Sequence, residues 1–297
     1  MRLREILKCS LRKTPAILAL FGTFMLFTTA VWGSDFHSPR TASLGGAGHA
    51  GPMLNDSIYL NPSYASFLST YSISMNYLRH KGPATEPDGS SFFHGHYQNI
   101  SIQDGRTELF QAGLGLTQEE NARVVHVGAS KTAIKRLGFG LGAKFIFPSN
   151  SNQRIEDLTF SATGIVAQNF HMVFVIDNLI QSAAAKGQGL YREYIIGTKL
   201  NIQNIMLVYF DPHLTSDITG ASLYGHETGL EFTIMSDLFL RLGAFNNAKS
   251  PVLKGLGRGY GAGFGWVAPR ISMDFAISRI LTPVALTQQV FGFTMYF

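Results

Sequence analysis

After residue 70 the chain alternates apolar residues with polar or small residues along most of its length. The clearest stretch spans residues 137–147, where Leu, Phe, Leu, Ala, Phe and Phe alternate with Gly, Gly, Gly, Lys and Ile. Successive residues of a β-strand point to opposite faces, so this stretch has one continuous apolar face. Its eleven residues match the length of a tilted transmembrane β-strand. The pattern therefore predicts membrane-spanning strands.

Fourteen segments carry this period of two, which predicts fourteen strands. The second segment is the least regular, because His94, His96 and Gln98 share a face with Ile100 and Ile102. That mixture indicates a bulge or a misplaced strand end. The predicted strands lie near residues 70–80, 92–103, 107–117, 122–131, 136–147, 157–167, 170–178, 191–201, 204–211, 222–234, 237–246, 258–268, 270–280 and 288–297.

The connections between these segments alternate in length. Long ones such as GPATEPDGSS and DPHLTSDITGAS follow odd-numbered strands, and short ones such as DGR, QN, NIQN, MSD and APR follow even-numbered strands. The connections beside the fourth strand fit this rule least. An outer-membrane barrel has short turns on one side and longer loops on the other, and its closure pairs every backbone group. We therefore predict an all-β fold, a transmembrane up-and-down antiparallel β-barrel of about fourteen strands.

Residues 1–33 read as a secretory signal peptide, because basic residues precede the apolar run of residues 15–32. Cleavage is expected near Ser34, with a cut after Ala30 as a second option, and an uncleaved membrane anchor is the alternative interpretation. Export followed by insertion of a barrel places the protein in the bacterial outer membrane.

Removal of the leader changes the charge balance. The mature chain keeps 19 basic and 18 acidic residues, so it lacks the basic excess that a nucleic-acid partner requires. The single cysteine, Cys9, also lies in the leader, so disulfides do not stabilise the mature chain.

The segment LGGAGHAGPMLNDSIYLNPSYASF at residues 44–67 separates the leader from the first strand. Its glycine pair, Asn-Asp and Asn-Pro-Ser resemble the N-terminal motif of the FadL long-chain fatty-acid transport family and the related PorV-like outer-membrane barrels. The resemblance implies a hatch, residues 34–67, that folds into the lumen of a barrel formed by residues 68–297. Glycine permits positive φ, and a proline keeps the residue before it out of helical geometry. A lead-in packed beneath the barrel is the alternative. The implied gate residues are Gly45, Gly46, Asn55, Asp56, Asn61 and Pro62.

The last strand and several aromatic residues predict contacts with the membrane and its machinery. Phe291, Phe293, Met295 and Phe297 share one face, and a terminal Phe after such a pattern resembles the signal that the barrel assembly machinery recognises. An ordinary edge strand is the alternative. Aromatics near strand ends are expected to form an interface girdle against outer-membrane lipid. These are Tyr71, Tyr77, Tyr194, Tyr209, Trp266 and Tyr296.

Other candidate chemistry is sparse. His94 and His96 could be half of a metal site, but no third ligand is identifiable. The glycine-rich stretch 255–263 precedes a strand and not a helix, which excludes a nucleotide loop. Those glycines, like Gly138, Gly140 and Gly142, are expected to relieve crowding on the inner face. We expect no catalytic residues, no metal ligands, no cofactor and no enzyme activity.

The family resemblance implies a function. It points to passive transport of hydrophobic small molecules, of fatty-acid type, through a lumen that the hatch gates. The alternative is a PorV-like interaction barrel that transports nothing and docks secreted or surface proteins. Docking predicts that the outer loops, notably residues 178–190 and 246–257, carry the function, whereas transport predicts that the hatch does.

Overall fold

The structure is a computed structural model that describes residues 36–83, 94–149, 153–187, 189–216 and 224–297. The predicted leader, its cleavage site near Ser34 and Cys9 lie outside the described residues.

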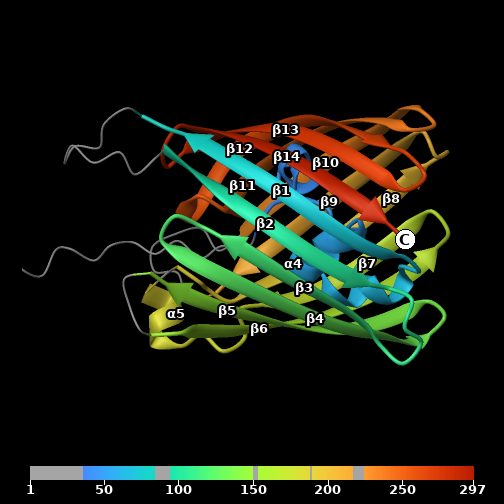
Figure 1. Ribbon diagram of the computed structural model, residues 1–297, viewed down its shortest axis with the longest axis horizontal. Helices are drawn as coiled ribbons and strands as arrows, with labels where there is room; N and C mark the ends of the chain where they lie inside the picture. Colours follow the sequence, from blue (N-terminus) through green and yellow to red (C-terminus); the bar gives the residue numbers. More distant parts are fainter. Residues whose placement is uncertain (1–35, 84–93, 150–152, 188, 217–223) are drawn as a thin grey trace, which may run out of the picture. The chain divides into compact units, whose positions relative to one another are not determined.

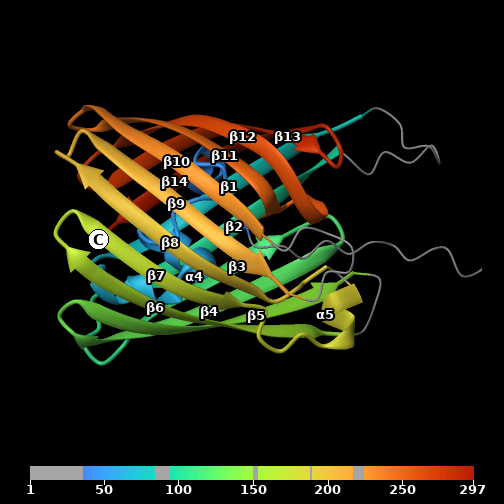
Figure 2. The ribbon, with the colours of Figure 1, turned by 180° about the vertical axis from the view of Figure 1, so that it is seen from behind.

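The described part of the chain contains fourteen strands in one closed antiparallel barrel. Each strand pairs with its neighbours in sequence, and β14 closes the barrel on β1, with Ser72 opposite Tyr296 and Lys81 opposite Thr287 (Figures 1 and 2). The strands are β1 Tyr71–Lys81, β2 His94–Asp104, β3 Gln111–Gln118, β4 Ala122–Ile134, β5 Leu137–Pro148, β6 Ile155–Ala167, β7 Phe170–Asp177, β8 Glu193–Ile202, β9 Met206–Thr215, β10 Tyr224–Met235, β11 Leu238–Ser250, β12 Leu253–Val267, β13 Ile271–Thr282 and β14 Leu286–Tyr296.

The predicted fold is confirmed, and every predicted strand corresponds to an observed one. The bulge suggested for the second strand was wrong, because β2 pairs with β1 in continuous register from His94 to Asp104. Its histidines are exposed on the outer face, at one end of the barrel.

Connection lengths agree with the prediction only in part. We call the end with connections 135–136, 168–169 and 236–237 the turn end, and the end with connections 82–93, 178–192 and 216–223 the loop end. Connections 119–121, 251–252 and 283–285 at the loop end are also short. The predicted loop at 246–257 was wrong, because β11 continues to Ser250 and β12 begins at Leu253. The 178–192 connection carries a short helix, α5 Ala183–Gly187.

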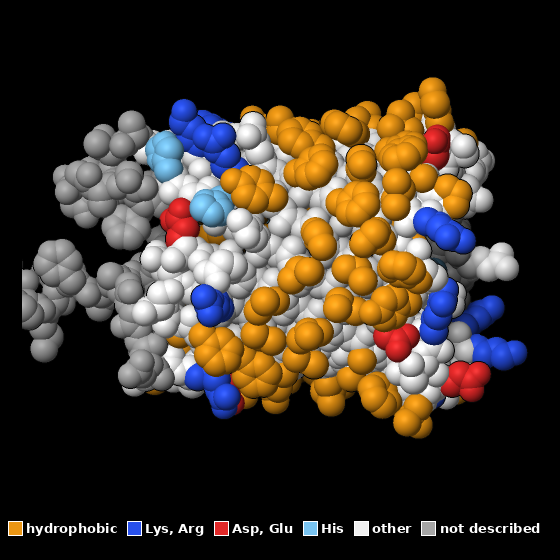
Figure 3. All heavy atoms as spheres, in the orientation of Figure 1, with side chains coloured by type: hydrophobic (Ala, Val, Ile, Leu, Met, Phe, Trp, Pro, Cys, Tyr) orange, Lys and Arg blue, Asp and Glu red, His pale blue; other side chains and the backbone are white. Residues whose placement is uncertain are grey.

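The outer face of the barrel is apolar. Alternate strand positions place large hydrophobic residues outward, including Leu141 at 63%, Phe264 at 53% and Phe291 at 51% exposed. Figure 3 shows such side chains over the middle of one face, with charged side chains mostly toward the two ends. Among the described residues, no helix is long and apolar enough to cross a membrane.

Residues 36–67 lie inside the closed sheet, against its inner face (Figures 1 and 2). This segment, which we call the plug, is buried except at His37, Met53, Leu54 and its last two residues, Ser66 and Phe67. Its elements are α3 Pro39–Ser43, η1 Leu54–Asp56, α4 Ser57–Leu60 and η2 Pro62–Phe67. Asn61, before Pro62, is extended at φ −159° and ψ 88°, as the proline requires.

Glycines on the inner face let the plug approach the wall closely. A Cβ added at Gly140 would collide with backbone atoms of Pro62 and Ser63, and one at Gly243 would collide with the backbone of Leu44. Only a residue without a side chain fits between wall and plug at these points. The expected role of the inner-face glycines in relieving crowding is therefore confirmed for Gly140.

Candidate functional site

A charged network joins α3 of the plug to four strands. Arg40 donates from Nε to Glu231 Oε2 at 3.0 Å and from Nη2 to Tyr209 Oη at 2.6 Å. Glu231 Oε2 also accepts from Arg241 Nε at 2.6 Å, and Arg241 Nη1 contacts Asp274 Oδ1 at 2.5 Å. Arg40 and Arg241 are 5% and 2% exposed, so both guanidinium groups depend on these carboxylates for compensation.

A second charged contact lies at His49. Asp211 Oδ2 accepts hydrogen bonds from the backbone N–H groups of Gly48 and His49, at 2.7 and 2.9 Å, and from His49 Nδ1 at 2.9 Å. Gly48 has φ +127°, a conformation that suits glycine and helps aim successive N–H groups at one oxygen. Burial lowers the pKa of His49, but the hydrogen bond and charge of Asp211 outweigh this and raise it to about 9. With this pKa, His49 is a cation at neutral pH.

Asp56, at the end of η1, links this part of the plug to α3. Its Oδ2 accepts from Ser38 Oγ at 2.8 Å and from Thr41 Oγ1 at 3.2 Å. Burial raises the pKa of Asp56 to about 6, although the charge of Arg40 and the two hydroxyl donors act in the opposite direction.

Several other contacts of the plug with the wall are neutral hydrogen bonds. Asn61 Nδ2 donates to Thr163 Oγ1 on β6 at 2.8 Å and to His49 O within the plug at 2.8 Å. The backbone N–H of Ser63 donates to Ser161 Oγ at 2.9 Å. Asn55 is held at two points on β1 and β2, where Ser72 Oγ donates to its Oδ1 at 2.6 Å and its Nδ2 donates to Ser101 Oγ at 3.1 Å.

All six predicted gate residues lie in the plug, but they do not converge on one point. Gly45 and Gly46 have φ of +68° and +92° and lie against β10 and β11, beside Ala244 and Glu227. Asn55 contacts β1 and β2, Asn61 contacts β6, and Pro62 lies against Gly140 and Gly142 of β5. They are spread around the wall, and their gating role stays a prediction.

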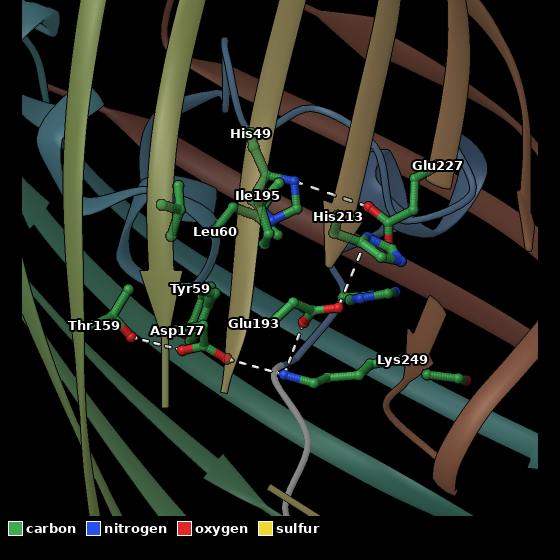
Figure 4. A pocket seen from close by; sticks show the side chains of 13 residues that line it. His49, Tyr59, Leu60, Thr159, Asp177, Glu193, Ile195, His213, Glu227 and Lys249 are labelled. Atoms are coloured by element: carbon green, nitrogen blue, oxygen red, sulfur yellow. Dashed lines mark hydrogen bonds and ion pairs between the residues drawn. The ribbon is translucent and has the colours of Figure 1, made fainter. Parts of the chain in front are cut away.

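A small polar cavity lies on the loop-end side of the plug (Figure 4). It encloses about 40 Å³, room for a few water molecules. Lys249 Nζ lies 2.8 Å from Glu193 Oε2 and 3.3 Å from Asp177 Oδ2 in its lining. His49, His213 and Glu227 line it as well.

A larger pocket lies on the turn-end side. It measures about 380 Å³, and its lining is largely apolar, with Arg40, Lys199 and Glu231 as the charged members. The plug therefore separates a small charged cavity from a larger apolar one. The apolar and aromatic lining residues are Pro52, Met53, Leu54, Tyr64, Leu68, Leu207, Tyr209, Val267, Pro269 and Tyr296.

The predicted membrane-facing residues divide into two groups. The structure places Tyr71, Tyr77, Tyr194 and Trp266 at outward positions, so their interface role stays a prediction. The prediction was wrong for Tyr209, which is fully buried and bonded to Arg40. It was also wrong for Tyr296, whose hydroxyl donates to Ser272 Oγ at 2.5 Å and which lines the turn-end pocket. Both occupy inward positions of their strands.

The predicted assembly signal lies on the outer face of β14 and at the chain end. Phe291 and Phe297 are 51% and 55% exposed, and Phe293 and Met295 are half-buried. Recognition by the assembly machinery stays a prediction.

Sequence reasoning missed the charged residues that hold the plug. Arg241 lies between Leu240 and Leu242, and both leucines are exposed on the outer face at 42% and 45%. Alternation therefore requires Arg241 to point inward, and the same holds for Glu231 between Leu230 and Phe232. An ionisable residue at an inward position of a membrane-spanning strand was the available signal.

The closed fourteen-stranded barrel with its plug resembles barrels of known structure. No protein-family model matches the sequence, and no curated protein matches it. Among solved structures, the chain is similar to the CymD monoaromatic hydrocarbon channel, with TM-score 0.65, 11% identity, and coverage of 90% of this chain and 99% of that one. It is also similar to the toluene transporter TbuX of Ralstonia pickettii, with TM-score 0.62, 10% identity, and coverage of 90% and 100%. A Pseudomonas aeruginosa FadL homologue gives TM-score 0.58, 12% identity, and coverage of 89% and 99%. The expected resemblance to FadL-like barrels is thus confirmed for the fold.

Proposed function

We propose that this protein is an outer-membrane channel for passive transport of hydrophobic small molecules, with the plug as its gate and the loop end facing outward. The observation that carries the proposal is the plug itself. Residues 36–67 occupy the lumen and bond to strands on different sides of the barrel, so passage requires the plug to move.

The structural neighbours support the hydrophobic substrate class, because CymD is a monoaromatic hydrocarbon channel and TbuX is a toluene transporter. The turn-end pocket of about 380 Å³ supports it as well, because its size and apolar lining are those of small-molecule sites. Aromatic hydrocarbons and fatty acids are both candidates, and the test includes both.

The test is uptake into proteoliposomes that contain the purified barrel. We expect the wild-type protein to admit toluene or a fatty acid faster than protein-free liposomes do. No uptake of either probe would contradict transport. If a secreted or surface protein also co-purified with the barrel from the outer membrane, the docking alternative would replace the proposal.

A disulfide lock tests the gate. A Cβ added at Gly197 of β8 would lie 3.0 Å from Cβ of His49, closer than the roughly 3.8 Å of a usual disulfide, and the bridge also requires the side chains of Val173 and Asp211, at 2.7 and 2.9 Å, to shift. The variant His49→Cys/Gly197→Cys should transport when reduced and stop when oxidised. Because the predicted mature chain has no cysteine, each single variant is a matched control. Equal uptake in both redox states of the double variant would exclude the plug as the gate.

A further inference from the structure

Three potential metal ligands meet where the plug touches β9 and β10. They are His49 of the plug, Asp211 of β9 and Glu227 of β10, and all three are buried. One ligand atom from each lies within 4.8 Å of the other two. His49 Nδ1 is 2.9 Å from Asp211 Oδ2 and 3.8 Å from Glu227 Oε2.

Glu227 supplies an independent sign that the site is incomplete. The residue is 5% exposed, and its Oε2 has no hydrogen-bond partner. Figure 4 shows its carboxyl group facing His49 at the edge of the loop-end cavity. A buried carboxylate oxygen without a partner is costly, so it calls for either a proton or a cation.

His49 Nδ1 is the cationic group in direct contact with this oxygen, but at 3.8 Å it is too far away for a hydrogen bond. Lys249 Nζ lies against Glu193 and Asp177, on the other side of the same cavity. His213 Nδ1 lies 3.7 Å from Glu193 Oε1, and its Nε2 is 3.1 Å from the carbonyl oxygen of Asn247. In the described part of the chain, His49 is thus one cation that two buried carboxylates, Asp211 and Glu227, share.

The spacing fits a tetrahedral transition-metal ion. Bonds of about 2.0–2.1 Å to nitrogen and carboxylate oxygen place neighbouring ligand atoms about 3.3–3.4 Å apart. The two measured separations, 2.9 and 3.8 Å, lie on either side of that value. One imidazole with two carboxylates suits Zn²⁺ better than Mg²⁺ or Ca²⁺, which take six or more oxygen ligands.

We propose that His49, Asp211 and Glu227 bind a divalent transition-metal ion of the Zn²⁺ type, with a water molecule from the loop-end cavity as the fourth ligand. Asp211 is already oriented for this role, because the N–H groups of Gly48 and His49 hold its Oδ2 and that of Thr198 donates to its Oδ1 at 3.2 Å. Binding displaces the proton that His49 Nδ1 shares with Asp211.

The ion would connect the plug to the wall, because one ligand belongs to the plug and two belong to strands. Metal binding itself does not depend on what the barrel transports. Its consequence, a plug held more firmly in the lumen, rests on the proposed function.

The experiment measures Zn²⁺ binding to the purified, metal-stripped full-length barrel by isothermal titration calorimetry, together with the shift in Tm. Wild type should bind one ion per chain and gain Tm. Glu227→Gln, which has the shape of the protonated acid, should weaken binding more than about 100-fold, beyond the loss typical of second-shell changes. It should still fold, and its Tm should not respond to Zn²⁺.

The exposed pair on β2 provides the control for adventitious binding. His94→Asn/His96→Asn removes two surface imidazoles and should leave the one-ion binding unchanged. Loss of binding in that variant, or unchanged binding in Glu227→Gln, would overturn the assignment. If Zn²⁺ left the Tm of wild type unchanged and Glu227→Gln were as stable as wild type, Glu227 would hold a proton and no metal ion, and the assignment would be wrong. Uptake assays do not enter these outcomes, so failure of the metal site and failure of transport remain distinguishable.

Discussion

The plug contacts the barrel in two chemically different ways. Against β9 and β10 it uses charges, where Arg40 bonds to Glu231, a carboxylate that Arg241 of β11 shares, and where His49 bonds to Asp211. Against β4, β5 and β6 it uses amides, hydroxyls and glycines, as where Asn61 donates to Thr163. Close packing at glycines occurs on both sides, as at Gly243 and Gly140, so charge neutralisation is what distinguishes the first contact from the second.

This difference indicates which side moves. η2 ends at Phe67 and β1 begins at Tyr71, so the neutral side is tied to the wall by the chain itself. In the described part of the chain the charged side has no such covalent tie nearby, and a buried ion pair becomes unfavourable once one partner changes. We therefore expect the plug to release at Arg40 and His49 and to stay anchored at Asn61 and Ser63.

The largest effect should follow from Glu231→Gln. Two buried guanidinium groups, Arg40 and Arg241, would lose their shared carboxylate, at a cost of about 3–5 kcal/mol. On the neutral side, Thr163→Val removes a hydroxyl that bonds Asn61, at a cost of about 1–3 kcal/mol. Chemical denaturation measures both, and equal losses would erase the distinction between the two sides.

The next effect is a pH dependence at Asp56, whose carboxylate faces Arg40 and Asp274. Its pKa is about 6 in the fold against an ordinary 3.8, so the folded state holds the proton more tightly. The corresponding stability is fully present below about pH 3.8 and is lost as pH rises through 6. A shift of this size corresponds to at most about 3 kcal/mol.

The measurement compares the unfolding midpoint of wild type and Asp56→Asn between pH 4 and about 7.5. The other carboxylates titrate in both proteins, so their contribution cancels in the difference. The difference between the two proteins should change mainly between pH 4 and about 6 and level off near pH 7, because the variant cannot ionise. A difference that stays constant over this range would contradict the raised pKa of Asp56.

The sequence was sufficient for the barrel but not for the partners of the plug. Alternation at residues 137–147 shows which face of the strand is apolar, and this pattern can be recognised within the strand itself, without knowing which strands pair with it. The contact between Arg40 and Glu231 spans 191 positions, and only barrel closure brings these residues together. Tyr209 was misplaced for the same reason, because an aromatic residue near a strand end fits an interface equally well until its inward position is known.

A smaller effect should follow from filling the glycine gaps. Gly243→Ala places a methyl group against the backbone of Leu44, and overpacking of this kind costs about 1–3 kcal/mol. Gly164→Ala on β6 is the matched control, because a Cβ there meets no atom within 4 Å. Thermal unfolding of the two variants measures the difference. A Gly243→Ala protein as stable as the control would mean that the plug does not press on β11.

The smallest effect is expected from a second disulfide, and it separates the anchored side from the mobile side most directly. Ser63 Oγ and Thr163 Oγ1 lie 2.7 Å apart, so Ser63→Cys/Thr163→Cys can form a bridge between η2 and β6. If the plug pivots about η2, oxidation of this bridge should leave uptake unchanged, while the bridge between residues 49 and 197 stops it. If both bridges stop uptake, the neutral contact also opens during transport and the plug moves as a whole.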